Sequence, residues 1–113
     1  MKILDEPIEK SRLLNAEELY EGPMVKGVVD VQKRLIAVDG DMYADLERML
    51  LATGSNQTDL WGVNFYPEED DMVDFLEFDS MINIRPRQGN RSRSVDDPEI
   101  QQQIIEIVKQ WIQ

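Results

Sequence analysis

The chain contains no cysteine and no histidine. Without cysteine it can form no disulfide bond, bind no metal through a thiolate and use no thiol nucleophile. Without histidine it lacks the side chain that most often serves as a general base or as a neutral metal ligand. A metal site would have to be built from oxygen ligands, which suit magnesium or calcium. We expect no bound metal and no cofactor.

Positive charge and long apolar runs are also scarce. The 113 residues include 12 lysines and arginines against 23 aspartates and glutamates, which gives a net charge of −11. Such a surface opposes binding of DNA, RNA or anionic lipid over the whole molecule, so an anion must be bound locally. No apolar run approaches the length of a membrane span, and the first ten residues have no apolar targeting segment. We therefore expect a cytoplasmic protein without a membrane partner.

The spacing of apolar and turn residues predicts the fold. An apolar content of 42% and the chain length indicate one folded domain over residues 1–113. The order α-ββ-α-ββ-α predicts an α+β fold of two layers, a four-stranded antiparallel or mixed sheet with helices on one face. Periodicity and breakers place helices at 8–20, 42–53 and 98–113, and strands at 24–31, 34–38, 60–66 and 75–85.

Alternation within the predicted strands separates an apolar face from a polar one. Val29, Trp61, Phe78, Ile82 and Ile84 belong to the face that should pack against helices. The other face should be open to solvent, as antiparallel sheets allow, with its charges paired across strands. The residues on this polar face are Lys26, Asp30, Asn64, Tyr66, Glu77, Asp79, Asn83 and Arg85.

Two segments, DLWGVNFYP and EFDSMINIRPRQGNRSR, resemble the prokaryotic family catalogued as domain of unknown function 5674. The similarity runs from KILDEPI through the last predicted helix. It implies a single domain, and the family brings no established activity with it. The positions that the resemblance marks are Asp59, Trp61, Gly62, Asn64, Pro67, Asp79, Ser80, Asn83, Arg85, Pro86, Gly89, Asn90, Arg91 and Arg93.

Four arginines fall within residues 85–93, here called the arginine loop, although the chain is strongly acidic. Guanidinium groups bind phosphate and carboxylate through paired hydrogen bonds, and Gly89 allows a turn that would bring the arginines together. The alternative is internal pairing, because seven acidic residues lie at 68–79 and three more follow the loop at 96–99. The predicted ligand-binding residues are Asn64, Asn83, Arg85, Asn90, Arg91 and Arg93.

Carboxylates offer a different chemistry. Asp30, Glu77 and Asp79 are the candidates for a general base or for binding magnesium in a phosphate-ester hydrolase. The acidic loop, residues 68–71, has four consecutive carboxylates but no EF-hand spacing. No phosphate-binding glycine loop, dinucleotide fingerprint or zinc motif is present.

The leading hypothesis is thus a small cytoplasmic binding module rather than an enzyme. Its arginine loop would hold an anionic small molecule or an acidic partner surface. The alternatives are a metal-assisted phosphate-ester hydrolase that uses Asp30, Glu77 and Asp79, and a structural homodimer in which the arginine loop meets a neighbour's acidic loop.

Overall fold

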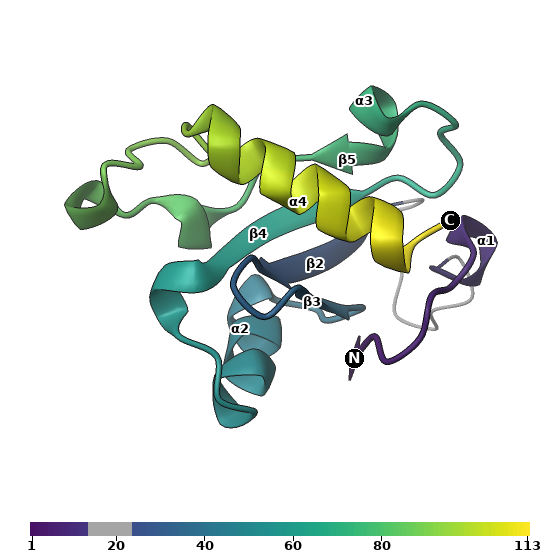
Figure 1. The fold of residues 1–113 in the computed structure, drawn as a ribbon, viewed down its shortest axis with the longest axis horizontal. Coiled ribbons are helices and arrows are strands. Elements are labelled where there is room, and N and C mark those ends of the chain that lie inside the picture. Colours follow the sequence, from purple (N-terminus) through teal and green to yellow (C-terminus); the bar gives the residue numbers. More distant parts are fainter. Residues whose placement is uncertain (14–23) are drawn as a thin grey trace.

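The computed structural model describes residues 1–13 and 24–113, which form an α+β fold around a five-stranded antiparallel sheet (Figure 1). The strand order is β1-β3-β2-β4-β5, with β2 at the centre. The strands are β1 (Lys2–Ile3), β2 (Val25–Asp30), β3 (Leu35–Val38), β4 (Leu60–Phe65) and β5 (Leu76–Glu77). The helices are α1 (Lys10–Leu13), α2 (Tyr43–Ala52), α3 (Met72–Phe75) and α4 (Pro98–Trp111), with 3-10 turns η1 (Gln57–Asp59), η2 (Met81–Asn83) and η3 (Pro86–Gln88).

The predicted hairpin is confirmed, because β2 and β3 pair with Asp30 opposite Leu35. The Asp30 carboxylate closes the turn by accepting hydrogen bonds from the backbone N–H groups of Gln32 and Lys33, both at 2.9 Å. Arg34 completes the turn in the left-handed region, with φ 58°. The hairpin forms where two short strands rich in apolar residues flank a short polar turn.

The ends of α2 and α4 follow the predicted signals. Gly54, at φ 101°, lies just beyond α2, in a conformation that glycine adopts without strain. At the start of α4, the Asp97 side chain accepts a hydrogen bond from the Glu99 N–H, and Pro98 occupies the first turn. Of the predicted first helix, α1 is described and residues 14–20 lie outside the described residues.

The prediction of two layers with helices on one face is wrong, because helices cover both faces of the sheet. On one face α4 packs its Ile104, Ile107 and Val108 into the larger core with Val29 and Trp61. On the other face α2 packs Leu46 and Leu50 against further sheet residues. Those sheet residues are Val28, Ala37 and Leu60. β2, β3 and β4 carry apolar side chains on both faces, as strands covered on both sides do.

The strand count and the last strand also need correction. Two-residue β1 adds a fifth strand beside β3 and is too short to leave an alternation signal. The predicted strand 75–85 is a strand only at Leu76–Glu77 and then becomes the turn η2. Phe78 packs toward the α4 side and Ile82 toward the α2 side, while Ile84 is 39% exposed. The alternation there does not reflect a sheet face, because the chain leaves the sheet after Glu77.

None of the helices in the described ranges 1–13 and 24–113 is long and apolar enough to span a membrane.

Candidate functional site

Part of the predicted polar face is confirmed by the strand register. Lys26 pairs with Asn64, and Asn64 pairs with Glu77, so these side chains form a row across β2, β4 and β5. The row shares its face with Val28 and Leu60 and continues the surface that α2 covers. The face is therefore not open along its whole length. The polar row lies at the end of the sheet where β5 pairs with β4, and Asp30 lies buried at the opposite end of the same face.

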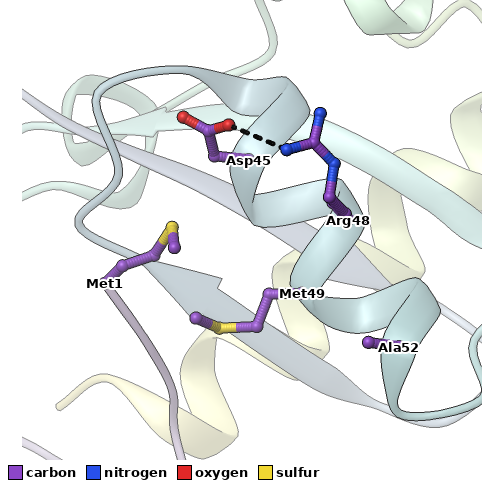
Figure 2. A pocket seen from close by; sticks show the side chains of 5 residues that line it. All are labelled: Met1, Asp45, Arg48, Met49 and Ala52. Atoms are coloured by element: carbon purple, nitrogen blue, oxygen red, sulfur yellow. Dashed lines mark ion pairs between the residues drawn. The ribbon is translucent and has the colours of Figure 1, made fainter.

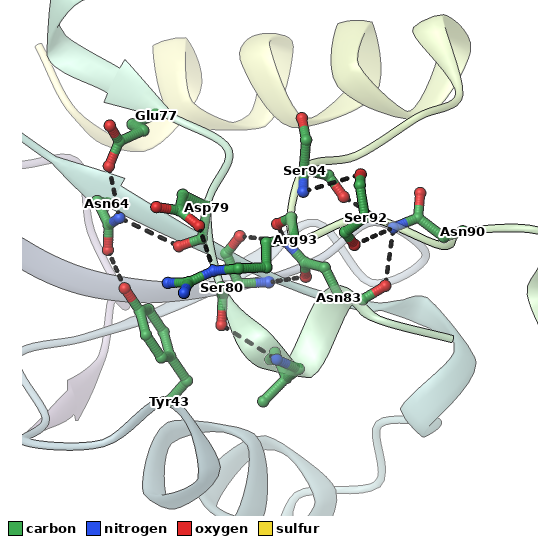
Figure 3. A network of polar contacts seen from close by, with 12 residues as sticks. Tyr43, Asn64, Glu77, Asp79, Ser80, Asn83, Asn90, Ser92, Arg93 and Ser94 are labelled. Atoms are coloured by element: carbon green, nitrogen blue, oxygen red, sulfur yellow. Dashed lines mark hydrogen bonds and ion pairs between the residues drawn. The ribbon is translucent and has the colours of Figure 1, made fainter. Parts of the chain in front are cut away.

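A hydrogen-bond network joins this row to the start of α2 (Figure 3). The Tyr43 hydroxyl donates to Asn64 Oδ1, and Asn64 Nδ2 donates to Glu77 Oε1 at 2.8 Å and to the Asp79 carbonyl at 3.1 Å. The Tyr66 hydroxyl also donates to Glu77 Oε1, at 3.0 Å. Every polar atom of the Asn64 amide is thus used within the protein. Its predicted role as a ligand-binding residue stays a prediction, and its observed role is to fix its neighbours.

Tyr43 is the member of the network that the sequence reasoning missed. Burial raises the pKa of Tyr43 to about 12, and the hydrogen bond to Asn64 offsets part of that increase. The phenol therefore stays protonated and remains a donor across the physiological pH range. The available signal was its position at the first residue of α2, directly after the DGDM segment that leads from β3.

We expect replacement of Tyr43 by phenylalanine to lower stability at neutral pH and to make stability less sensitive to alkali. The pKa of Tyr43 is about 12 in the folded chain and about 10 when unfolded. Its contribution is therefore complete below about pH 10 and is lost as the pH rises toward 12. Urea midpoints of both proteins between pH 8 and pH 11 would measure this contribution. The difference in midpoint between the wild type and the variant should narrow only above about pH 10. Burial also raises the pKa of Tyr66. Because Tyr66 is present in both proteins, its effect on the pH dependence cancels in the comparison. A constant difference would contradict the prediction.

Arg93 is the arginine that reaches this network. Its Nε donates to Asp79 Oδ1 at 2.7 Å in an ion pair whose side chains are 54% and 43% exposed. Its backbone carbonyl accepts from the N–H of Ser80 and from Asn83 Nδ2. The predicted internal pairing is thus found for this arginine. It is the only arginine of the loop that is paired with a carboxylate in the described part of the chain.

Arg85 lies elsewhere and bonds to main-chain oxygens. Its guanidinium donates to the carbonyl groups of Ile82 (2.9 Å), Gln57 (2.9 Å) and Leu60, and it lies 4.7 Å from the centre of the Trp61 ring. Burial lowers its pKa. Since Arg85 is held at the Leu60 end of β4 and Arg93 at the Asn64 end, the two guanidiniums are separated by about four strand residues, or about 13 Å. The structure does not bring them together on one anion.

The side chain of Asn83 bonds the backbone of Gly62 in β4, where a neighbouring strand would otherwise pair. Figure 3 shows this side chain beside Arg93. Its Oδ1 accepts from the Gly62 N–H at 2.8 Å, and its Nδ2 donates to the Gly62 carbonyl and to the Arg93 carbonyl, both at 2.9 Å. The residue is fully buried. A side chain at Gly62 would overlap with Ser80, so glycine is what allows the η2 segment to lie this close to β4.

Asn90 closes the arginine loop from within. Its Nδ2 donates to the carbonyls of Asn83 (2.8 Å) and Ser94 (2.7 Å), and its Oδ1 accepts from the Asp96 N–H at 2.7 Å. Backbone hydrogen bonds link Arg85 and Asn90 in both directions. The predicted role of Asn90 as a ligand-binding residue stays a prediction, and its observed role is to close the loop. Together with Asn83 and Arg85 it holds a segment that has little regular secondary structure.

Arg87, Arg91 and Arg93 are all exposed, and Arg87 and Arg91 differ from Arg93 in lacking a side-chain partner among the described residues. Within residues 1–13 and 24–113, neither guanidinium has a hydrogen bond or an ion pair. Arg91 donates only its backbone N–H, to Asp96 Oδ2 at 3.1 Å. The hydrogen bond from the Ser92 hydroxyl, together with the smaller effect of the Arg91 N–H, holds the pKa of the Asp96 carboxyl below its usual range.

The three candidate catalytic carboxylates do not form one site. Asp30 is fully buried at the last position of β2, opposite Leu60 of β4. Its Oδ2 accepts a hydrogen bond from the Ser55 hydroxyl at 2.6 Å. Glu77 and Asp79 lie around Asn64, at the opposite end of β4. The described residues contain no group of three acidic side chains close enough to hold a metal ion. Asp30 therefore serves the hairpin turn and cannot act together with the other two.

An open pocket of about 320 Å³ lies elsewhere, between the chain start and α2 (Figure 2). Met1, Met49 and Ala52 supply its apolar lining, and an ion pair of 3.7 Å between Asp45 and Arg48 borders it. None of these residues belongs to the predicted site.

The chain belongs to the family described as "Protein of unknown function (DUF5674)", whose model matches residues 2–111. The resemblance noted in the sequence is thereby confirmed over almost the whole chain. No curated protein and no solved structure matches the chain.

Proposed function

We propose that the protein is a small, non-enzymatic cytoplasmic binding module whose arginine loop holds a carboxylate-bearing partner surface. The observation that carries the proposal is the contrast within the loop. Asn83, Arg85 and Asn90 are used internally to fix its backbone, whereas the guanidiniums of Arg87 and Arg91 are exposed and unpaired among the described residues. A rigid loop loses little conformational freedom on binding, which favours this role.

A carboxylate surface fits better than a nucleic acid. Residues 79–97 contain no aromatic side chain on which a base could stack. Asp96, Asp97 and Glu99 are exposed beside the loop and would repel a continuous chain of phosphates. Compact anionic groups that reach Arg87 and Arg91 alone avoid that repulsion, and arginine is common at the centres of protein interfaces.

The hydrolase alternative has less support. It requires Asp30, Glu77 and Asp79 in one place, and Asp30 is buried in the hairpin turn at the other end of the sheet. No specific contact of the described residues favours it.

The proposal is tested by titrating a short oligo-glutamate peptide and inorganic phosphate into 15N-labelled protein and following amide shifts at residues 85–93. We expect the peptide to bind, and the double variant Arg87→Ala/Arg91→Ala to weaken binding by more than about tenfold while remaining folded, because exposed substitutions are mild. Arg48→Ala is the matched control, since its side chain is 79% exposed on α2. Absence of peptide binding, or unchanged affinity in the double variant, would overturn the proposal.

A further inference from the structure

The arginine loop is accompanied by exposed apolar side chains. Met81 is 63% exposed in η2, and Ile84 is 39% exposed directly before Arg85. Met and arginine are both enriched at the centres of protein interfaces relative to the rest of the surface. Met81, Ile84, Arg87 and Arg91 are exposed residues of the segment 81–91, and they are here together called the basic end.

A second surface on the same chain has the opposite charge and also an apolar residue. In the acidic loop, Glu68, Glu69, Asp70 and Asp71 are all exposed, and Val73 in α3 is 89% exposed. None of these four carboxylates forms an ion pair within the described parts of the chain. The loop backbone is nevertheless fixed, because Lys10 Nζ donates to the carbonyls of Glu69 (3.2 Å) and Asp70 (3.0 Å) and lies 4.4 Å from the centre of the Phe75 ring. The acidic loop and Val73 are here called the acidic end.

The two surfaces cannot satisfy each other within one molecule. Figure 1 shows α3 and the segment before it toward the end of the long axis where α1 lies, and the segment between β5 and α4, which carries the arginine loop, reaching the opposite end. The molecule extends 37 Å along this axis. Exposed charges that are further apart than the Debye length, about 10 Å at 0.1 M salt, are largely screened from each other.

We infer that the carboxylate-bearing partner of the basic end is the acidic end of a second copy of this chain. This inference rests on the proposed function and names its partner. Arg87 and Arg91 would face the carboxylates of residues 68–71, while Met81 and Ile84 would cover Val73. Such a contact joins unlike surfaces of identical chains. It is small, below about 1,200 Å², and belongs with weak, transient interfaces.

Salt should affect this contact in two opposite ways. Two copies with a net charge of −11 repel each other over long distances, and about 0.1 M salt screens that repulsion. Near 1 M the Debye length falls to about 3 Å, and the local attraction between exposed charges is screened as well. Association should therefore be strongest near about 0.1 M salt and should weaken by more than about tenfold by 1 M.

The test measures weight-average mass by sedimentation equilibrium as protein concentration rises at about 0.1 M salt. Variant A carries Arg87→Glu and Arg91→Glu. Variant B carries Glu68→Gln, Glu69→Gln, Asp70→Asn and Asp71→Asn, which leaves the backbone contacts of Lys10 in place. The control carries Asp5→Asn, Glu6→Gln and Glu9→Gln, which remove exposed charges elsewhere.

We expect the wild type and the control to exceed the monomer mass of 13.1 kDa as concentration rises, and A and B alone to remain monomeric. An equimolar mixture of A and B should regain association, because B supplies an intact basic end and A an intact acidic end. A wild type that stays monomeric, variants that associate normally, or a mixture no better than its components would each overturn the inference. If the wild type is monomeric but still binds oligo-glutamate through Arg87 and Arg91, the proposed function stands and only the identity of the partner is wrong.

Discussion

Replacing Asn83 by alanine should lower the free energy of unfolding by about 3 to 5 kcal/mol. The buried amide makes three hydrogen bonds, two to the main chain of Gly62 and one to the carbonyl of Arg93. Alanine would leave the N–H and carbonyl of Gly62 without these partners in a dry interior, and each such group costs roughly 1–3 kcal/mol. For a domain whose total stability is about 5–15 kcal/mol, the variant should be close to unfolding at physiological temperature.

Urea denaturation followed by circular dichroism measures this loss. Asn56→Ala is the matched control, because Asn56 is exposed and its side chain makes no capping hydrogen bond to η1. The control should change stability by less than about 0.5 kcal/mol. A loss below about 1 kcal/mol for Asn83→Ala would mean that the contacts with Gly62 do not anchor the segment after β5.

The elements that sequence reasoning predicted correctly are those with local signals. The hairpin of β2 and β3, the end of α2 near Gly54 and the start of α4 at Asp97 each depend on residues within a few positions of one another. Local hydrogen bonds and backbone preferences determine such boundaries, so a single sequence is sufficient to locate them.

The second covered face was predictable in principle. The sequence Leu35–Val38 contains four consecutive apolar residues, and Val28 and Val29 are adjacent in β2. Apolar neighbours in a strand point to opposite faces, so such runs indicate burial on both sides. Lys26, Asp30 and Asn64 suggest an open face when read alone, but they lie near the ends of β2 and β4, and the middle of that face is covered by α2.

The roles within the candidate site were not predictable from local sequence. Asn83 and Arg85 have the chemical character of ligand-binding residues, but their acceptors lie on Gly62, Gln57 and Leu60, more than 20 residues earlier in the chain. An arginine that bonds main-chain carbonyls cannot be distinguished by sequence from one that binds an anion, because both require the same forked donor. Tertiary contacts decide between the two, and among the described residues they leave Arg87 and Arg91 as the arginines of the loop without a side-chain partner.

Whether Arg85 bonds main-chain carbonyls or binds an anion determines how far its replacement by alanine lowers stability. If Arg85 were primarily an anion-binding residue, Arg85→Ala would stay as stable as the wild type. The structure instead leads us to expect a loss of about 3–4 kcal/mol, because hydrogen bonds from a charged donor contribute roughly 1.5–3 kcal/mol each. Removal of the guanidinium takes the donor away from the carbonyls of Ile82, Gln57 and Leu60, and also removes its stacking over Trp61. The partial exposure of the site keeps the total below a simple sum.

Arg85→Lys separates geometry from charge. An ammonium retains the positive charge but cannot reach three carbonyls that are arranged around a planar fork, so lysine should recover less than about half of the lost stability. Arg87→Ala is the control within the same loop and should be nearly neutral, since its side chain is exposed. Full recovery by lysine would show that charge alone matters at this position. A stable Arg85→Ala variant would show that the contacts of Arg85 with β4 do not hold the loop. Arg85 would then again be a candidate for binding an anion.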